Sequence, residues 1–386
     1  MNHVRYYIAR ILLVSLKPMA LIAVSYLIDD LTANHVALAL AISAITSAAL
    51  SLGIYRRIYK ASGRKRLYHE SCRRVYFYFH TVFICVALYL VQLYDLISDD
   101  LVYIVMVIVI TDHVIHDESR YLLYSGDREK WAVSSLIRGS YLIAAPAIYV
   151  LIEGITFVEA LLLSSLPNYI YSIVGGGLMM PLGAQFSVIK RKSLYLRYFA
   201  LSNYLIASIS TKIVQQSDRL LFSFVSYDSL WLYSLVAQVG NISAMLWEMV
   251  EVSKLKERVA KLDFYRYRSF DGYYIKKAII FSSFASVCFA FLIVIEPNLL
   301  DVYWMVLFVI ILISNIPYMM NMINMEQFFW RAKRPIDFLK LEIFISVPII
   351  FLGSILVGAL GMAYLVKIPF LATQLLKANR LSKCMN

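Results

Sequence analysis

Runs of about twenty apolar residues recur along the whole of this chain. A run of that length, folded as an α-helix, crosses a hydrocarbon core that is about 30 Å thick. Inside lipid every backbone polar group needs a partner within the protein, and a helix provides these partners within a single segment. The runs therefore predict an all-α integral membrane protein.

The composition agrees with this prediction. Hydrophobic residues make up 61% of the 386 residues and charged residues make up 16%, whereas a soluble domain has about 25% charged residues. A soluble fold of this length has no single core that would bury so much apolar surface. We predict twelve membrane spans, at 9–28, 35–55, 75–94, 101–121, 132–152, 157–178, 198–217, 229–250, 277–297, 302–325, 336–355 and 358–377.

The positions of the basic residues predict the orientation of these spans. With the N-terminus in the cytoplasm, the inner segments hold 31 of the 37 Lys and Arg residues, and the outer segments hold Arg219 alone. Such a bias toward the inner side is the main sequence signal of topology, and it places both termini in the cytoplasm. The other five basic residues lie within spans: Lys17, Arg138, Lys212, Lys340 and Lys367.

The same distribution explains the net charge of +12. Because the charge lies almost wholly in inner segments, where topology requires it, we expect no nucleic-acid partner. The cysteines have no metal-type spacing and predict no disulfide framework, and no nucleotide-binding motif is found. We therefore expect neither a metal site nor a cofactor. The four cysteines are Cys72, Cys85, Cys288 and Cys384.

Two pairs of prolines indicate an internal duplication. Pro146 and Pro167 are 21 residues apart, as are Pro348 and Pro369, and the two pairs are offset by 202 residues. With nine prolines in the chain, coincidence is the alternative explanation. We predict two parallel six-helix bundles around a central cavity, 1–190 and 191–386, an arrangement that is typical of transporters.

Four basic residues at membrane depth are candidates for substrate binding. Ionisable groups within spans are costly, so each indicates a functional site by default. Lys17 lies in the middle of the first span and directly precedes Pro18. Together with Arg138, Lys212 and Lys367 it would suit an anionic head group such as a phosphate. The alternatives are that these side chains extend to the membrane surface or pair with neighbouring helices.

The fourth span contains the polar stretch TDHVIHDESR at 111–120. Asp112 and His116 lie one helical turn apart on one face, and His113 lies beside them. A carboxylate next to a histidine exchanges protons near neutral pH, so these three residues are candidates for ion coupling. The alternatives are a polar helix end that enters the cytoplasm and a metal site, for which further ligands are lacking.

Three stretches resemble one known family. They are QQSDRLLFSFVSYDSLWLYSLVAQVGNI at 215–242, LVGALGMAYLVKIPFLATQLL at 356–376 and SGDREKWAVSSLIRGSYL at 125–142. They are similar to regions of the O-antigen (Wzx-type) polysaccharide flippases of the multidrug/oligosaccharidyl-lipid/polysaccharide exporter superfamily. Asp218 and Arg219 match the Asp-Arg pair that this family carries at the outer end of its seventh helix.

The resemblance implies a specific activity. Such proteins move an oligosaccharide linked to undecaprenyl pyrophosphate across the bacterial inner membrane by ion-coupled alternating access, and they are not enzymes. The partners of this chain would then be the lipid-linked oligosaccharide, membrane lipids and the glycan polymerase machinery. The residues of the cavity or its gate would be Lys17, Arg138, Lys212, Asp218, Arg219 and Lys367.

Other classes of membrane protein remain as alternatives. A small-solute carrier of the major facilitator type also has twelve helices, and GRKR at 63–66 is similar to the end of that family's loop signature. The acidic residue expected before it is missing, because Arg56, Arg57 and Lys60 stand there. An integral-membrane polymerase or transferase of glycan assembly is a further alternative, although the large outer loop usual for those enzymes is absent. The last is a scaffold without transport activity.

Overall fold

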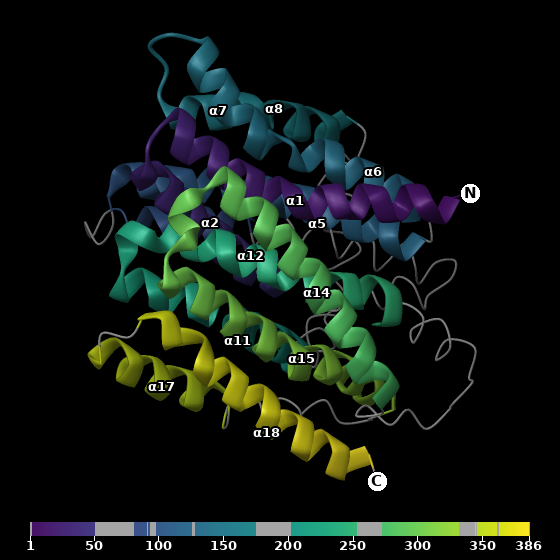
Figure 1. Cartoon of the computed structure of the whole chain (residues 1–386). Helices are drawn as coiled ribbons and strands as arrows, with labels where there is room; N and C mark the ends of the chain where they lie inside the picture. Colours follow the sequence, from purple (N-terminus) through teal and green to yellow (C-terminus); the bar gives the residue numbers. More distant parts are fainter. Residues whose placement is uncertain are drawn as a thin grey trace. The chain divides into compact units, whose positions relative to one another are not determined.

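A computed structural model of the whole chain shows an all-helical protein in its described residues (Figure 1). The structure describes residues 2–50, 81–90, 92, 98–125, 128–174, 202–252, 272–331, 344, 346–360 and 363–385. These residues form two compact units, Met1–Lys212 and Ile213–Asn386. The boundary predicted at 190/191 lies outside the described residues.

The described residues of the N-terminal unit form helices of different lengths. The described helices are α1 (Asn2–Leu27), α2 (Asp30–Leu50), a short helix at Thr81–Leu90, α5 (Asp99–Ser125), α6 (Arg128–Gly139), α7 (Tyr141–Leu151) and α8 (Phe157–Val174). Thr156 and Glu159 begin α8 with reciprocal hydrogen bonds, in which the Glu159 carboxylate accepts the Thr156 N–H at 2.7 Å and Thr156 Oγ1 accepts the Glu159 N–H at 3.3 Å. Such a capping box satisfies backbone donors that the first turn of a helix leaves open.

The C-terminal unit begins within α11 (Ser202–Val225). A 3₁₀ turn, η1 (Tyr227–Ser229), leads into α12 (Leu230–Trp247), and a π-helical segment, η2 (Glu248–Val252), continues it. The remaining elements are α14 (Gly272–Ile295), η3 (Pro297–Leu300), α15 (Val302–Arg331), α17 (Val347–Ala359), η5 (Ala363–Lys367) and α18 (Ile368–Met385).

The two units repeat the same order of helix neighbours. In the N-terminal unit α2 packs on α5, α5 on α8, and α7 on α8. In the C-terminal unit α12 packs on α15, α15 on α18, and α17 on α18. Each of the two proline pairs lies on two helices that pack together, Pro146 and Pro167 on α7 and α8, and Pro348 and Pro369 on α17 and α18. A duplication would produce this pattern.

Helix occupies at least part of each of the twelve predicted ranges. Within the described residues, four helical stretches are long and apolar enough to cross a membrane, by length and composition: Val133–Leu151, Tyr227–Trp247, Tyr274–Ile295 and Val302–Met322. The described part of the chain is therefore all-helical, and its four apolar stretches are those of a multi-pass membrane protein. Twelve spans, two six-helix bundles and cytoplasmic termini stay predictions.

The bounds of several elements differ from the predicted ones. The predicted span at 132–152 contains the helical stretch Val133–Leu151, which a single turn residue, Ser140, divides into α6 and α7. In the last predicted range, 358–377, α17 ends at Ala359, Ala363–Lys367 form the 3₁₀ segment η5, and α18 begins at Ile368. Pro369 then lies in the first turn of α18, where the N–H that proline lacks is not needed.

Candidate functional site

A buried aspartate on α5 organises the polar interior of the N-terminal unit. Asp112 accepts hydrogen bonds from Ser43 Oγ on α2, at 2.6 Å to Oδ2, and from the Tyr141 hydroxyl on α7, at 3.1 Å to Oδ1. Each carboxylate oxygen therefore has its own hydroxyl donor. Three helices that are distant in sequence meet at this side chain.

Lys17 on α1 lies beside this carboxylate without a hydrogen bond to it. Its Nζ is 3.8 Å from Asp112 Oδ2, which is beyond the usual N–H···O range of about 2.7–3.2 Å. The Lys17 side chain is 38% exposed, against 8% for Asp112. We call Lys17, Ser43, Asp112 and Tyr141 the Asp112 cluster.

The break between α6 and α7 supplies two residues of this interior. On one side of it, the Arg138 guanidinium donates to Asn168 of α8. Three residues later, the Tyr141 hydroxyl donates to Asp112 of α5. Gly139 permits α1 to lie close to the break, because a Cβ there would lie 3.1 Å from the Leu16 side chain and 3.3 Å from that of Leu13. The register of α1, and hence the position of Lys17, is fixed by this close packing.

Arg138 joins α6 to α8 through Asn168. Its Nε donates to Asn168 Oδ1 at 3.2 Å and its Nη2 to the Asn168 carbonyl at 3.4 Å, while Asn168 Nδ2 donates to the Arg138 carbonyl at 3.1 Å. The guanidinium also lies over the ring of Tyr171, 5.1 Å from its centroid. These contacts are those of a helix-pairing residue, which was one of the alternatives to substrate binding that the sequence allowed.

The other ion-coupling and cationic candidates of this unit are placed only in part. His113 follows Asp112 in the chain and is also buried. Thr111, which precedes Asp112, shares a hydrogen bond of 2.6 Å with the Tyr169 hydroxyl on α8. Asp112 and His113 are therefore enclosed by the unit. His116 and Lys212 lie on α5 and α11, and their side chains are outside the described part of the structure.

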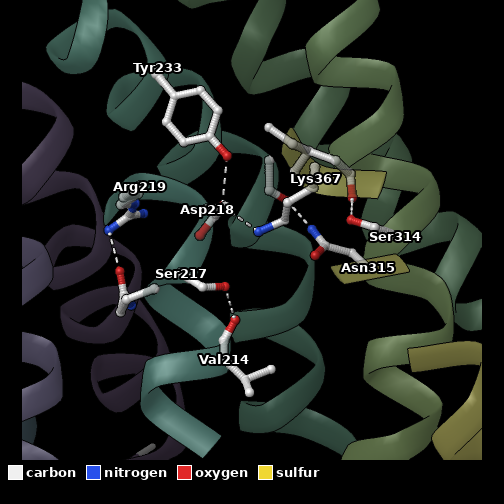
Figure 2. Close-up of polar contacts among 11 residues, drawn as sticks. Val214, Ser217, Asp218, Arg219, Tyr233, Ser314, Asn315 and Lys367 are labelled. Atoms are coloured by element: carbon white, nitrogen blue, oxygen red, sulfur yellow. Dashed lines mark hydrogen bonds and ion pairs between the residues drawn. The ribbon is translucent and has the colours of Figure 1, made fainter. Parts of the chain in front are cut away.

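A second buried aspartate, Asp218 on α11, organises the C-terminal unit (Figure 2). Its Oδ2 is 2.6 Å from Lys367 Nζ and accepts the Tyr233 hydroxyl of α12 at 2.8 Å. Asp218 is 3% exposed and Lys367 is 2% exposed. The Lys367 ammonium also lies 4.4 Å from the centroid of the Phe370 ring. We call Asp218, Tyr233 and Lys367 the Asp218 cluster.

The placement of Asp218 and Arg219 corrects the sequence analysis. The predicted span ended at residue 217 and left both residues at its outer end, but α11 continues to Val225 and both are buried within it. The helix continues because Phe222 is fully buried and stacks on the Tyr233 ring, with 4.3 Å between centroids. Arg219 donates to Gln216 Oε1 at 3.1 Å, on the other side of Asp218 from Lys367 (Figure 2).

Further polar contacts link the helices of the C-terminal unit. Asn315 on α15 donates to the Gly240 carbonyl of α12 at 2.9 Å, and Asn321 donates to the Gln374 carbonyl of α18 at 2.7 Å. These residues were not predicted from the sequence, and neither were Ser43, Tyr141 and Asn168. Isolated amides within apolar runs were the available signal, because such side chains commonly hydrogen-bond across membrane helices.

The two clusters have different chemical capacities. The Lys367 ammonium is neutralised at hydrogen-bond distance and is enclosed, so it is not available to a ligand in this structure. Lys17 keeps an exposed portion and has no hydrogen bond to its carboxylate neighbour. Within the described residues, no group of three or more His, Cys, Asp or Glu side chains is placed to hold a metal ion.

Comparisons with known proteins leave the family open. No protein-family model matches the sequence, and no curated protein is significantly similar to it. A solved structure titled "MATE transporter ClbM in complex with Rb+" is similar over 100% of this chain and 91% of its own, with a TM-score of 0.44 and 13% sequence identity. A likeness this distant does not assign the chain to a family or to an activity.

Proposed function

We propose that this protein moves a polyprenyl-pyrophosphate-linked oligosaccharide from the inner to the outer leaflet of the bacterial inner membrane, for polysaccharides of the O-antigen or capsule type. The observation that carries the proposal is the position of Lys17, a partly exposed cation in the middle of an apolar helix. A charged group at that depth is costly and so indicates a function.

The chemistry of the Asp112 cluster supports an anionic substrate. A lysine ammonium is a compact charge on a flexible stem and suits phosphate groups. Lys17 is 3.8 Å from its carboxylate neighbour and partly exposed, so a pyrophosphate would compete with Asp112 for the same ammonium. The family resemblance of 125–142, 215–242 and 356–376 supports the lipid-linked oligosaccharide as the particular anion.

The remaining site predictions belong to this proposal. Asp112, His113 and His116 are the proposed groups for ion coupling. Lys212 and Arg219 join Lys17 as proposed residues of the substrate path, whereas Lys367, which is enclosed by its pair with Asp218, would act only through that pair. Arg138 and Asp218 would act indirectly, by holding helices and by pairing with Lys367.

A complementation experiment tests the proposal. In a strain that lacks the gene, we expect complete lipid-linked repeat units to accumulate on the inner leaflet and surface polysaccharide to disappear. Lys17→Ala should restore transport about tenfold less well than the wild type, because a hydrogen bond to a charged group contributes about 1.5 kcal/mol or more. Protein levels in the membrane must be matched between the strains.

Two other outcomes identify other functions. If repeat units reach the outer leaflet of the deletion strain but stay unpolymerised, the protein is an enzyme of glycan assembly. If the surface polysaccharide is unchanged, the glycan function is wrong and a small-solute carrier replaces it. A suitable control is Ser165→Ala, since the buried Ser165 hydroxyl bonds only to the Leu161 carbonyl of its own helix, at 2.7 Å, among the contacts that the structure records.

A further inference from the structure

We propose that Lys17 changes partners during transport: it pairs with Asp112 when the substrate is absent and leaves Asp112 for the pyrophosphate group when the substrate binds. Ser43 and Tyr141 are then positioning residues, which hold Asp112 in place after Lys17 has left. This inference rests on the proposed function and describes how its anion site is regulated.

The first support is that Asp112 does not depend on Lys17 for its hydrogen bonds. Ser43 supplies a donor to Oδ2 at 2.6 Å and Tyr141 supplies one to Oδ1 at 3.1 Å. Removing the partner of a buried charge is ordinarily very unfavourable, because the charge is left uncompensated. Two hydroxyl donors reduce that penalty here, so the Lys17–Asp112 pair separates more easily than an isolated buried pair.

The second support is the weakness of the pair itself. The Lys17 ammonium is 3.8 Å from Asp112 Oδ2, beyond hydrogen-bond distance, and its side chain is only partly enclosed, so the pair lacks the short charge-assisted hydrogen bond of a strong ion pair. A doubly charged pyrophosphate with several acceptor oxygens is a stronger partner for an ammonium than this carboxylate. The substrate therefore has sufficient differential affinity to displace Asp112.

The third support is that the movement is confined to a side chain. The α1 backbone is held by Leu13 and Leu16 against Gly139, while Lys17 itself is only partly enclosed. A lysine stem has four carbons and moves its ammonium by several ångströms without movement of the helix. Release of the product restores the pair, so Asp112 acts as a competitor that limits how tightly the substrate is held.

Amine labelling of the full-length protein in lipid nanodiscs tests the exchange directly. Lys17 is acetylated with a membrane-permeant reagent, and the rate is read by peptide mass spectrometry. Asp112→Asn should increase the Lys17 labelling rate by up to about fivefold, the equivalent of the upper range for an exposed ion pair. Ser43→Ala should decrease the rate by about twofold, because the vacated Oδ2 becomes available to Lys17.

Two variants serve as controls for this interpretation. Ser43→Thr keeps a hydroxyl and should restore the wild-type rate, which a general loss of packing would not do. Ser165→Ala, which removes a buried hydroxyl bonded within its own helix, should leave the rate unchanged. Ser43→Ala also keeps the Asp112 charge, so it provides a second test if Asp112→Asn does not fold.

The probe for the ligand is undecaprenyl pyrophosphate, with uncharged undecaprenol as its control. We expect the pyrophosphate to protect Lys17 from labelling, more strongly in Asp112→Asn than in the wild type, and undecaprenol to give no protection. Unchanged labelling in both Asp112→Asn and Ser43→Ala would overturn the exchange while leaving the proposed function intact. Changed labelling without protection by the pyrophosphate would overturn both the proposed substrate and the exchange.

Discussion

The two units of this protein each enclose an aspartate, a tyrosine and a lysine, but they arrange the lysine differently. In the C-terminal unit Lys367 is 2.6 Å from Asp218 and both are almost fully buried. In the N-terminal unit Lys17 is 3.8 Å from Asp112 and partly exposed. A tyrosine hydroxyl bonds to the aspartate in both, Tyr233 in one and Tyr141 in the other.

The difference in distance and exposure separates a structural pair from an available charge. Asp218 receives both of its donors on Oδ2, and its Oδ1 is buried without a hydrogen bond to any residue that the structure describes. The Lys367 ammonium is therefore the main compensation for that carboxylate. Asp112 has donors on both oxygens, which leaves Lys17 less constrained.

The largest expected loss of stability is therefore at the Lys367–Asp218 pair. Lys367→Ala leaves a buried carboxylate uncompensated and should lower the free energy of unfolding by about 3–5 kcal/mol. Thermal unfolding of the purified protein measures this loss. The double variant Asp218→Asn/Lys367→Met should recover part of the stability, because it removes both charges of the pair and leaves Arg219 as the buried charge beside them. Wild-type stability in Lys367→Ala would show that the pair is not structural.

A smaller effect is expected where Arg138 joins α6 to α8. Arg138→Ala removes charge-assisted hydrogen bonds to Asn168 and should reduce stability by about 1.5–3 kcal/mol. Arg138→Lys should recover only part of this, because an ammonium does not reproduce the two-point contact. If Arg138→Ala is as stable as the wild type but loses transport, Arg138 binds the substrate and is not a helix-pairing residue. Unfolding and transport assays on the same variants distinguish the two roles.

Helix packing at one glycine within each unit allows a further comparison, with an expected loss of stability similar to that of Arg138→Ala. A Cβ at Gly240 would lie 2.5 Å from the Ile311 Cγ2 methyl, whereas one at Gly139 would lie 3.1 Å from Leu16. Overpacking is unfavourable by about 1–3 kcal/mol, so Gly240→Ala should lose more stability than Gly139→Ala. Ile311→Leu removes the β-branched methyl and should relieve part of the loss. Equal losses in the two glycine variants would contradict the tighter packing of α12 on α15.

The smallest loss of stability is expected at the Lys17–Asp112 pair. Lys17→Ala should change the free energy of unfolding by less than about 1 kcal/mol while it reduces transport. Unfolding of this variant is compared with that of Lys367→Ala under the same conditions. A loss of stability as large as that of Lys367→Ala would show that Lys17 is also a structural residue.

Among the described residues, hydropathy was sufficient to predict where helices lie, because lipid imposes one length and one backbone conformation on a span. It did not predict the break at Gly139–Tyr141 or the continuation of α11 to Val225, since both depend on packing against other helices. The charge at Lys17 was recognised as unusual from depth alone. Its partner Asp112 was singled out for a different reason, as a neighbour of His113.

The contacts that define the two clusters were not accessible from the sequence. Asp218 and Lys367 are 149 residues apart, and nothing in either stretch specifies the other. A serine such as Ser43 in an alanine-rich helix faces lipid or protein depending on the rotation of that helix, which no local pattern fixes. Tyr141 and Asp112 are 29 residues apart, and only the tertiary structure brings the Tyr141 hydroxyl to the Asp112 carboxylate.

The most direct test of the account is to compare the reactivity of the two lysines in one sample. The native protein in nanodiscs is treated with a membrane-permeant amine reagent, and the acetylation of Lys17 and Lys367 is followed over time. We predict that Lys17 reacts in the native protein and that Lys367 reacts only after unfolding. Equal rates at the two residues would contradict the distinction between an available and an enclosed lysine, and with it the assignment of Lys17 as the anion-binding group.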